Sequence, residues 1–297
     1  MKNVALGFDH LDDYVNHSPY FGAVVGRIAG RIADSQFNLN DKTYKITQNE
    51  GKNHLHGGIK GFSHVLWDYQ VIEKPDSIGV EFTYTSKAGE EGFPGNVEVT
   101  TTYMVNEINQ LDIYYHATTD EDTIINLTNH TYFNLSGDLN NTIKNHLLQL
   151  DSSRFLELRE DSIPTGQAVS VEGTPFDFLT SKPISQGMDN GFRQNELVGN
   201  GFDHPFVLDS NFNREIELTD PESGRKLVIE TDQPAVVIYT SNQYEGDYEI
   251  RGVPPHHHMA ICLETQGFPD AINQPDFPPV TLRKDEVYKA HTRYIFE

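Results

Sequence analysis

Alternation of apolar and polar residues, the pattern of half-buried β-strands, recurs along most of this 297-residue chain. In NVEVTTTYMV (96–105), valines alternate with polar residues before a run rich in β-branched and aromatic side chains. Similar stretches lie at 79–86, 111–119, 214–220, 225–232, 235–243, 258–265 and 286–296. Turn-forming pairs such as Asp220-Pro221 separate them. Helical periodicity is weak, and we expect short helices only near residues 8–15 and 180–196.

No linker, charge run, change of composition or fixed-period repeat divides the sequence. The pattern therefore predicts an all-β fold, a large antiparallel β-sandwich that spans residues 1–297 as a single domain with long loops on one face. The 17 phenylalanines and 14 tyrosines are enough aromatic residues to fill a wide, flat core.

The balance of charge excludes two classes of partner. The chain carries 44 acidic and only 22 basic residues, which gives a net charge of −22 at pH 7. This excess of carboxylates repels nucleic-acid phosphates and anionic membrane surfaces, so neither is an expected partner. A neutral ligand such as a sugar is not repelled.

Cysteine content and the N-terminal residues indicate the compartment. Cys262 is the only cysteine, so no disulfide can form within the chain, as suits a reducing environment. The N-terminal stretch MKNVALGFDHLDDY lacks the apolar core and cleavage site of a signal peptide. No run approaches the ~18 apolar residues of a membrane-spanning helix. We therefore expect a cytoplasmic protein.

Histidines raise the question of a metal site. His54 and His56 are expected to point from the same face of a strand, and the run 256–258 follows two prolines, where His256 and His257 would be solvated. No carboxylate lies at a familiar metal-ligand offset from the first pair, and only one thiol exists. We therefore expect no metal, and a metal-dependent β-sandwich enzyme stays an alternative.

Motifs for nucleotide binding and for a serine nucleophile are missing. The glycines of HLHGGIKG lack the Lys-Ser/Thr of a phosphate-binding loop, and no G-x-S-x-G turn is present.

Five polar residues at strand ends or in loops are the remaining candidates: Arg31, His56, His130, Asp203 and Glu264. Each also has an ordinary structural explanation, such as a surface ion pair or a turn cap. Glu264 follows the apolar stretch Ala-Ile-Cys-Leu, so we expect it at a sheet rim, partly buried, with a raised pKa. From the residues alone, the sequence predicts a β-sandwich with a possible acid/base site of Glu and His.

Together with their surroundings, these positions resemble the aldose 1-epimerase family, the galactose mutarotases. The matching motifs are LGFDHLDDY, YFGAVVGRIAGRIA, NEGKNHLHGG followed by Trp67, EGFPGNVEV, NHTYFNLSG, GFDHPF and LETQGFPDAINQPDF. They occur in the family's order from residue 6 to the C-terminus, so the resemblance covers almost the whole chain. It implies the galactose mutarotase type of antiparallel sandwich, with an open sugar cleft on a concave sheet.

The resemblance also implies a reaction and roles for the candidates. The reaction interconverts the α and β anomers of aldohexoses such as D-galactose and D-glucose by acid/base ring opening. His130 matches the family's general acid and Glu264 its general base, so His130 would start protonated and Glu264 ionised. Arg31, His56 and Asp203 match the residues that hold ring and hydroxyl oxygens. The partner is a sugar, no cofactor is expected, and the protein would be a monomer or homodimer.

The chain departs from the family's pattern in three places. Gly30 stands where many relatives have asparagine before the arginine, which removes one hydrogen bond to the sugar. The apolar Val237-Ile238 stands where some relatives present a glutamine. The motif LGFD lies close to Met1, so we expect the family's first strand or two to be missing.

Aromatic residues near these motifs could cover the carbon face of a sugar. Phe206, Phe268 and Trp67 are the candidates, although core packing is the alternative for each. Two alternative functions stay open: a non-catalytic sugar-binding or sugar-sensing protein on the same fold, and an enzyme for a phosphorylated hexose, which the scarcity of Lys and Arg disfavours.

Overall fold

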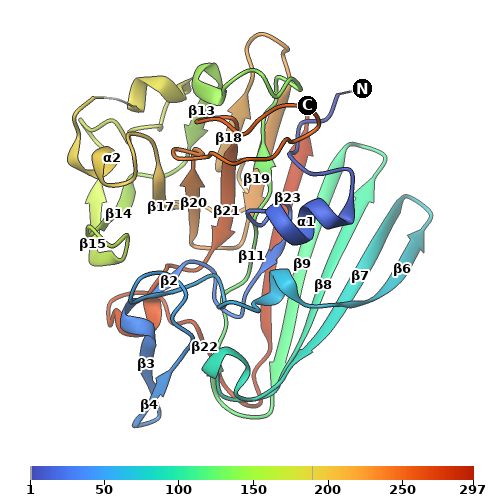
Figure 1. Ribbon diagram of the computed structural model, residues 1–297, viewed down its shortest axis with the longest axis vertical. Helices are drawn as coiled ribbons and strands as arrows, with labels where there is room; N and C mark the ends of the chain where they lie inside the picture. Colours follow the sequence, from blue (N-terminus) through green and yellow to red (C-terminus); the bar gives the residue numbers. More distant parts are fainter. Residues whose placement is uncertain (1, 189) are drawn as a thin grey trace.

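Two antiparallel β-sheets face one another across a shared hydrophobic core in this computed structural model, which describes residues 2–188 and 190–297 (Figure 1). The larger sheet has nine strands in the order β16-β13-β18-β19-β23-β9-β8-β7-β6. The smaller sheet has six, in the order β12-β21-β20-β17-β14-β15. The expected all-β sandwich is confirmed.

The strands of the larger sheet are β6 (Asp68–Lys74), β7 (Ser77–Ser86), β8 (Val97–Asn106), β9 (Gln110–Thr119), β13 (Leu147–Leu150), β16 (Lys182–Pro183), β18 (Ile216–Thr219), β19 (Lys226–Thr231) and β23 (Tyr288–Phe296). Those of the smaller sheet are β12 (Tyr132–Phe133), β14 (Arg154–Leu158), β15 (Pro164–Ser170), β17 (Asp203–Val207), β20 (Ala235–Tyr239) and β21 (Ile261–Gln266).

Short paired strands and single helical turns complete the described fold. The pairs are β1 (Val24–Val25) with β11 (Thr128–Asn129), β2 (Arg31–Ile32) with β5 (His54–Leu55), β3 (Gln36–Leu39) with β4 (Lys42–Lys45), and β10 (Thr123–Ile124) with β22 (Thr281–Leu282). Turns of 3₁₀-helix lie at Ala33–Ser35, Phe62–His64, Glu90–Gly92, Ile143–Asn145, Ile184–Gly187 and Ala271–Asn273.

The α-helices are α1 (Leu11–His17) and α2 (Arg193–Leu197), both within or next to the two regions where we expected helix. In the described part of the chain, no helix has the length and apolar character needed to cross a bilayer.

Period-two alternation decides which side chains enter the core between the sheets. On β20, Val236 and Ile238 are fully buried in that core, whereas Val237 points to the opposite face. On β21, Leu263 joins the core, and Glu264 lies beside Val237, its partner across the ladder. The outer face of the smaller sheet is therefore available for a site.

The N-terminal residues lie against the outer edge of β12. Leu6 N–H donates to the Tyr132 carbonyl at 2.9 Å, and Asn134 N–H donates to the Val4 carbonyl at 2.8 Å. A bridge between Ala5 and Phe133 completes the contact. Residues 4–6 thus occupy the position of an additional strand at this end of the smaller sheet.

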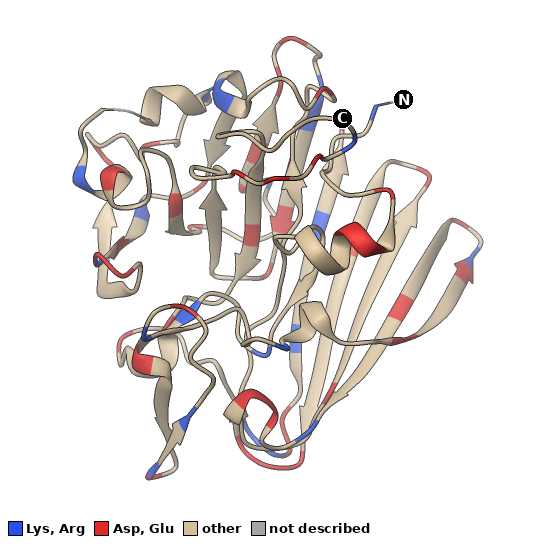
Figure 2. Ribbon diagram, in the orientation of Figure 1, with Lys and Arg blue, Asp and Glu red and all other residues tan. Residues whose placement is uncertain are grey.

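Acidic residues are spread over loops and strands of the fold, and basic residues are sparser (Figure 2). The negative charge is therefore distributed along the chain and is not gathered in one segment.

Candidate active site

A cleft of about 370 Å³ opens on the outer face of the smaller sheet. The polar residues proposed from the sequence as the site all line it: Arg31, His56, His130, Asp203 and Glu264. They come from β2, the end of β5, the segment between β11 and β12, β17 and β21. The fold therefore brings together side chains that are widely separated in the chain.

The cross-strand register forms the floor of this cleft. Asp203 on β17 pairs with Tyr239 on β20, which pairs with Cys262 on β21. In the adjacent row, Val237 pairs with Glu264. Since side chains two residues apart share a face, these rows present a carboxylate, a phenol ring and apolar groups side by side.

Glu264 is more deeply buried than the sequence predicted. We expected it at a sheet rim, but it is the fourth of six residues of β21, which runs between β12 and β20, and only 2% of it is exposed. Its Oε2 has no hydrogen-bond partner among the described residues. Burial raises the pKa of Glu264 well above its ordinary value, Asp203 adds to this effect, and Arg31 opposes it.

His130 directly follows β11 and meets Glu264 inside the cleft. Its Nε2 lies 3.5 Å from Glu264 Oε1, and its Nδ1 lies 3.6 Å from Cys262 Sγ. The ring stacks between Tyr20 and Tyr132, with centroid distances of 5.5 and 5.0 Å. Burial lowers the pKa of His130 to about 4. The free protein therefore differs from our expectation, because burial favours a neutral His130 and a protonated Glu264.

His56 presents a hydrogen-bond donor to the cleft. The backbone N–H of Gly30 donates to His56 Nδ1 at 3.2 Å, so the neutral ring carries its proton on Nε2. Burial lowers the pKa of His56 well below its ordinary value, and the neighbouring His130 and Arg31 reinforce this effect. His56 is thus a neutral N–H donor.

His54 and His56 do not share a face, contrary to our expectation. His56 adopts a φ of 51°, which ends the alternation of β5 and turns its ring into the cleft. The His54 ring instead points away, where Nδ1 contacts the Thr47 carbonyl at 2.6 Å and the ring packs edge-on against Phe93.

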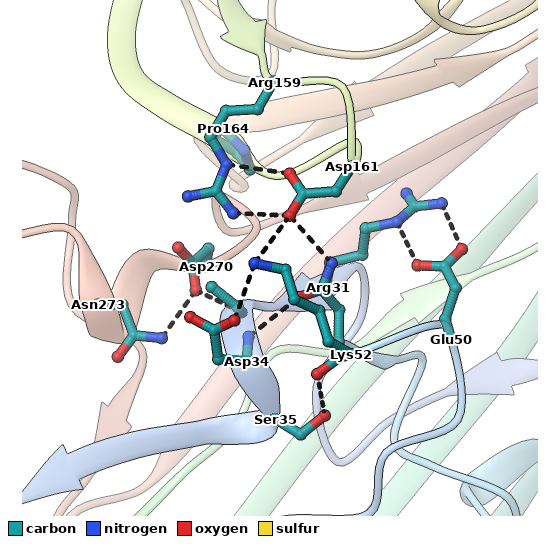
Figure 3. Close-up of polar contacts among 12 residues, drawn as sticks. Arg31, Asp34, Ser35, Glu50, Lys52, Arg159, Asp161, Pro164, Asp270 and Asn273 are labelled. Atoms are coloured by element: carbon teal, nitrogen blue, oxygen red, sulfur yellow. Dashed lines mark hydrogen bonds and ion pairs between the residues drawn. The ribbon is translucent and has the colours of Figure 1, made fainter.

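Arg31 is held by the carboxylate of Glu50 (Figure 3) and lies beside that of Asp203. Its Nε and Nη2 donate to the two oxygens of Glu50 at 2.6 and 2.7 Å, and its Nη1 lies 4.0 Å from Asp203 Oδ2. Burial by itself would lower the pKa of Arg31, but Asp203, Glu50 and Glu264 outweigh it and raise the pKa. Burial raises the pKa of Asp203, an effect that Arg31 opposes. Sequence reasoning missed Glu50, although it stands in the motif NEGKNHLHGG.

Three of the cleft residues lie at a spacing that suits a metal ion. Ligand atoms of His56, His130 and Glu264 all lie within 4.8 Å of one another. However, the Gly30 N–H occupies the Nδ1 lone pair of His56, so binding at Nε2 would move a proton to Nδ1, against that N–H. Histidines that bind metals normally donate from the other ring nitrogen to an acceptor. This site is therefore poorly suited to a metal, and the expected absence of one stays a prediction.

The histidine run 256–258 lies outside the lining of this cleft. His257 is exposed, as expected, and its Nε2 lies 2.7 Å from Glu245 Oε1. His256 is half-buried rather than solvated, because its Nε2 bonds the Leu139 carbonyl at 2.8 Å.

Tyrosines, not the aromatic residues proposed from the sequence, line the cleft: Tyr20, Tyr132 and Tyr239. Phe206 is fully buried between the sheets, Phe268 packs edge-on against Phe277, and Trp67 packs against Phe62. Two of the tyrosines could have been identified from the sequence, because residues two positions apart on a strand point to the same face. Tyr132 lies two residues after His130, and Tyr239 lies two residues after Val237.

The positions that depart from the family's pattern also adjoin the cleft. Gly30 lines it with a φ of +74°, and Val237 lines it as an apolar residue, whereas Ile238 points into the core. Side-chain amides are supplied instead by Gln243 and Gln266, which the sequence did not reveal.

Comparison with known proteins gives a consistent result. The aldose 1-epimerase family model matches residues 1–295. Galactose mutarotase from Bos taurus is 43% identical over 298 residues, which cover 99% of this chain and 84% of the relative. Aldose 1-epimerase from Haemophilus influenzae is 37% identical over 279 residues, 93% of this chain and 80% of the relative.

Solved structures agree with this result. The aldose epimerase homologue from C. elegans has a TM-score of 0.89 at 30% identity, over 99% of this chain and 87% of the other. Galactose 1-epimerase from Lactobacillus acidophilus has a TM-score of 0.90 at 29% identity, over 100% of this chain and 85% of the other.

Proposed function

Since this chain belongs to the aldose 1-epimerase family and is therefore an isomerase that acts on a sugar, we propose that Glu264 and His130 are its two proton carriers. The substrates that we propose are aldohexoses such as D-galactose and D-glucose. The observation that carries the assignment is the pair itself. Glu264 lines the cleft, its Oε1 lies 3.5 Å from His130 Nε2, and its buried Oε2 has no hydrogen-bond partner among the described residues.

The proposed reaction opens and recloses the sugar ring. Glu264 removes the proton from the C1 hydroxyl while His130 donates a proton to the ring oxygen, so the bond between C1 and the ring oxygen breaks and a neutral aldehyde forms. Rotation of the aldehyde exposes its other face. Ring closure then reverses both proton transfers, and each carrier returns to its starting state.

Burial disfavours the charged form of each carrier in the free cleft, since it raises the pKa of Glu264 and lowers that of His130 to about 4. A sugar hydroxyl bound at Glu264 would supply the hydrogen bond that Oε2 lacks and favour the carboxylate. The resulting negative charge, 3.5 Å away, in turn favours protonated His130. Substrate binding thereby sets the protonation states that ring opening needs.

The remaining polar groups position the sugar. His56 offers an N–H, Arg31 offers guanidinium protons, and Asp203 accepts hydrogen bonds from hydroxyls. Val237 and the tyrosine rings supply apolar contact for the carbon face. Correct alignment matters because proton transfer requires close contact between the reacting atoms.

Polarimetry of freshly dissolved α-D-galactose and α-D-glucose tests this function. We expect the protein to accelerate the change in optical rotation well beyond the spontaneous rate. Sugar binding without acceleration would instead support a non-catalytic sugar-binding protein.

We further propose a cytoplasmic protein that works as a monomer or homodimer without nucleic-acid or membrane partners. The net charge of −22 and the single, buried thiol of Cys262 support this setting.

A further inference from the structure

Glu50 satisfies one full edge of the Arg31 guanidinium. Both of its carboxylate oxygens accept hydrogen bonds, from Nε at 2.6 Å and from Nη2 at 2.7 Å. This side-on, two-point geometry is also the one that a free carboxylate or phosphate takes on arginine. An anionic ligand would therefore have to displace Glu50 to use this edge.

A second carboxylate stands beside the other edge. Arg31 Nη1 lies 4.0 Å from Asp203 Oδ2, so one guanidinium is flanked by two carboxylates. Among the residues that line the described cleft, Arg31 is the only arginine, and none is a lysine. With Glu50 and Asp203 beside Arg31, the cleft therefore has no surplus of positive charge for an anion.

The sequence around Glu50 explains its position. β2 and β5 pair antiparallel with Arg31 opposite Leu55, and a tight turn over 50–53 leads into β5. The turn places Glu50 next to the side chain of Arg31, outside the residues that line the cleft, with its own side chain 36% exposed. A carboxylate here contacts the cleft's cation without occupying the floor.

We propose that Glu50 is a specificity-determining residue that excludes anionic sugars, such as uronic acids and sugar phosphates, by occupying the Nε/Nη2 edge of Arg31. This inference rests on the proposed function of the cleft as a sugar site. Neutral aldoses need only single hydrogen bonds from Arg31, and the Nη1 and Nη2 protons that point away from Glu50 can supply them.

The test compares D-galactose with D-galacturonate, which differ at C6, in calorimetric binding to wild type, Glu50→Gln, Glu50→Asp and Asp161→Asn. Asp161 is the matched control, since its side chain has a similar exposure of 31% and pairs with Arg159 and Lys52 rather than with Arg31. Circular dichroism and the melting temperature establish that each variant is folded.

We expect wild type to favour galactose over galacturonate, and Glu50→Gln to narrow that preference by about tenfold or more, the worth of one charge-assisted contact. Glu50→Asp should largely retain the preference, and Asp161→Asn should leave it unchanged. High salt should weaken the preference of wild type, because Glu50 is partly exposed.

An unchanged ratio of the two affinities in Glu50→Gln, or an equal change in Asp161→Asn, would overturn the proposal. Because binding is measured, this result is separate from the outcome of polarimetry. If galactose binds without turnover, the proposed reaction is contradicted, but the ratio of the affinities for galactose and galacturonate can still be measured. Failure of wild type to bind either sugar would contradict both.

Discussion

The backbone N–H of Gly30 and the Nδ1 atom of His56 are joined by a hydrogen bond of 3.2 Å that decides which ring nitrogen of His56 faces the cleft with a proton. Residues 30 and 56 are brought together by the pairing of β2 with β5. Gly30 lacks the side chain of the family's asparagine, but its backbone N–H positions the ring of His56.

Substitution of Gly30 tests this connection. A Cβ at residue 30 lies 3.0 Å from Pro269 in either variant, but the φ of +74° is accessible to asparagine at low cost and is strained for a β-branched residue. We expect Gly30→Asn to be tolerated and Gly30→Val to lower the free energy of unfolding by about 1–2 kcal/mol or more. Urea denaturation measures both, and equal stability of the two variants would contradict the argument.

Loss of the His56 donor should weaken use of the sugar. We expect His56→Ala to lower kcat/KM for galactose by roughly 2- to 10-fold, since a hydrogen bond between neutral groups contributes about 0.5–1.5 kcal/mol. Asp203→Ala should have a larger effect, because a hydrogen bond to a carboxylate contributes about 1.5–3 kcal/mol. Initial rates from polarimetry give the values, and wild-type kinetics in both variants would remove these residues from the binding site.

Removal of a proton carrier should affect turnover more than binding. Glu264→Gln keeps the shape of the side chain but cannot take a proton, so we expect kcat to fall by ~10²–10⁴ while galactose still binds. His130→Asn should lower kcat to a similar extent. The loss of kcat in the double variant should be much smaller than the product of the two single losses, because the two residues act as a pair. Near-normal kcat in Glu264→Gln would refute the proposed mechanism.

The same Glu264→Gln change should stabilise the protein near neutral pH. A raised pKa means that the folded state holds a proton that the unfolded chain releases above its ordinary pKa of 4.5, so stability is lost as the pH rises. The variant has no such loss. We expect its free energy of unfolding at pH 7 to exceed that of wild type, with a smaller gap at pH 4.5. A variant that is less stable than wild type at pH 7 would contradict this account.

Buried histidines should make the protein sensitive to acid. Burial lowers the pKa of His130 and His146 to about 4 and that of His204 to about 3, from 6.5. The unfolded chain therefore binds these protons first, and stability is lost as the pH falls from about 6.5 towards 4. Each buried histidine should contribute of the order of 1–3 kcal/mol to this loss. Melting temperatures measured across this range should fall, and His204→Gln should reduce the slope.

Sequence periodicity was sufficient for the sandwich, because alternation such as that of Val236, Val237 and Ile238 is a local property of a strand. Periodicity does not reveal which of the two faces enters the core. Phe206 was therefore offered as a sugar contact, although the register of β17 against β20 places it between the sheets. That residues 1–297 form a single domain stays a prediction.

The residues of the candidate site could be predicted from the sequence because their motifs resemble a known family. The pKa shifts of these residues could not be predicted in the same way. The protonation states of His130 and Glu264 depend on burial by β12, β20 and Tyr20. These elements come from separate parts of the chain and surround the two side chains only in the folded protein. Glu50 was missed for the same reason: its contact with Arg31 exists only once β5 has folded back beside β2.

Because side chains alternate along β20 and β21, amino-acid substitutions and changes of strand length have different consequences for the cleft. Positions 237, 239, 264 and 266 face the cleft, whereas their immediate neighbours 236, 238 and 263 hold the sheets together. A point mutation at the first group alters what the cleft accepts without opening a cavity in the core. A one-residue insertion or deletion exchanges the two groups, which turns core residues towards the cleft and Glu264 into the apolar core between the sheets. Along these strands, substitutions can therefore change the sugar preference during evolution, whereas insertions and deletions disrupt the fold.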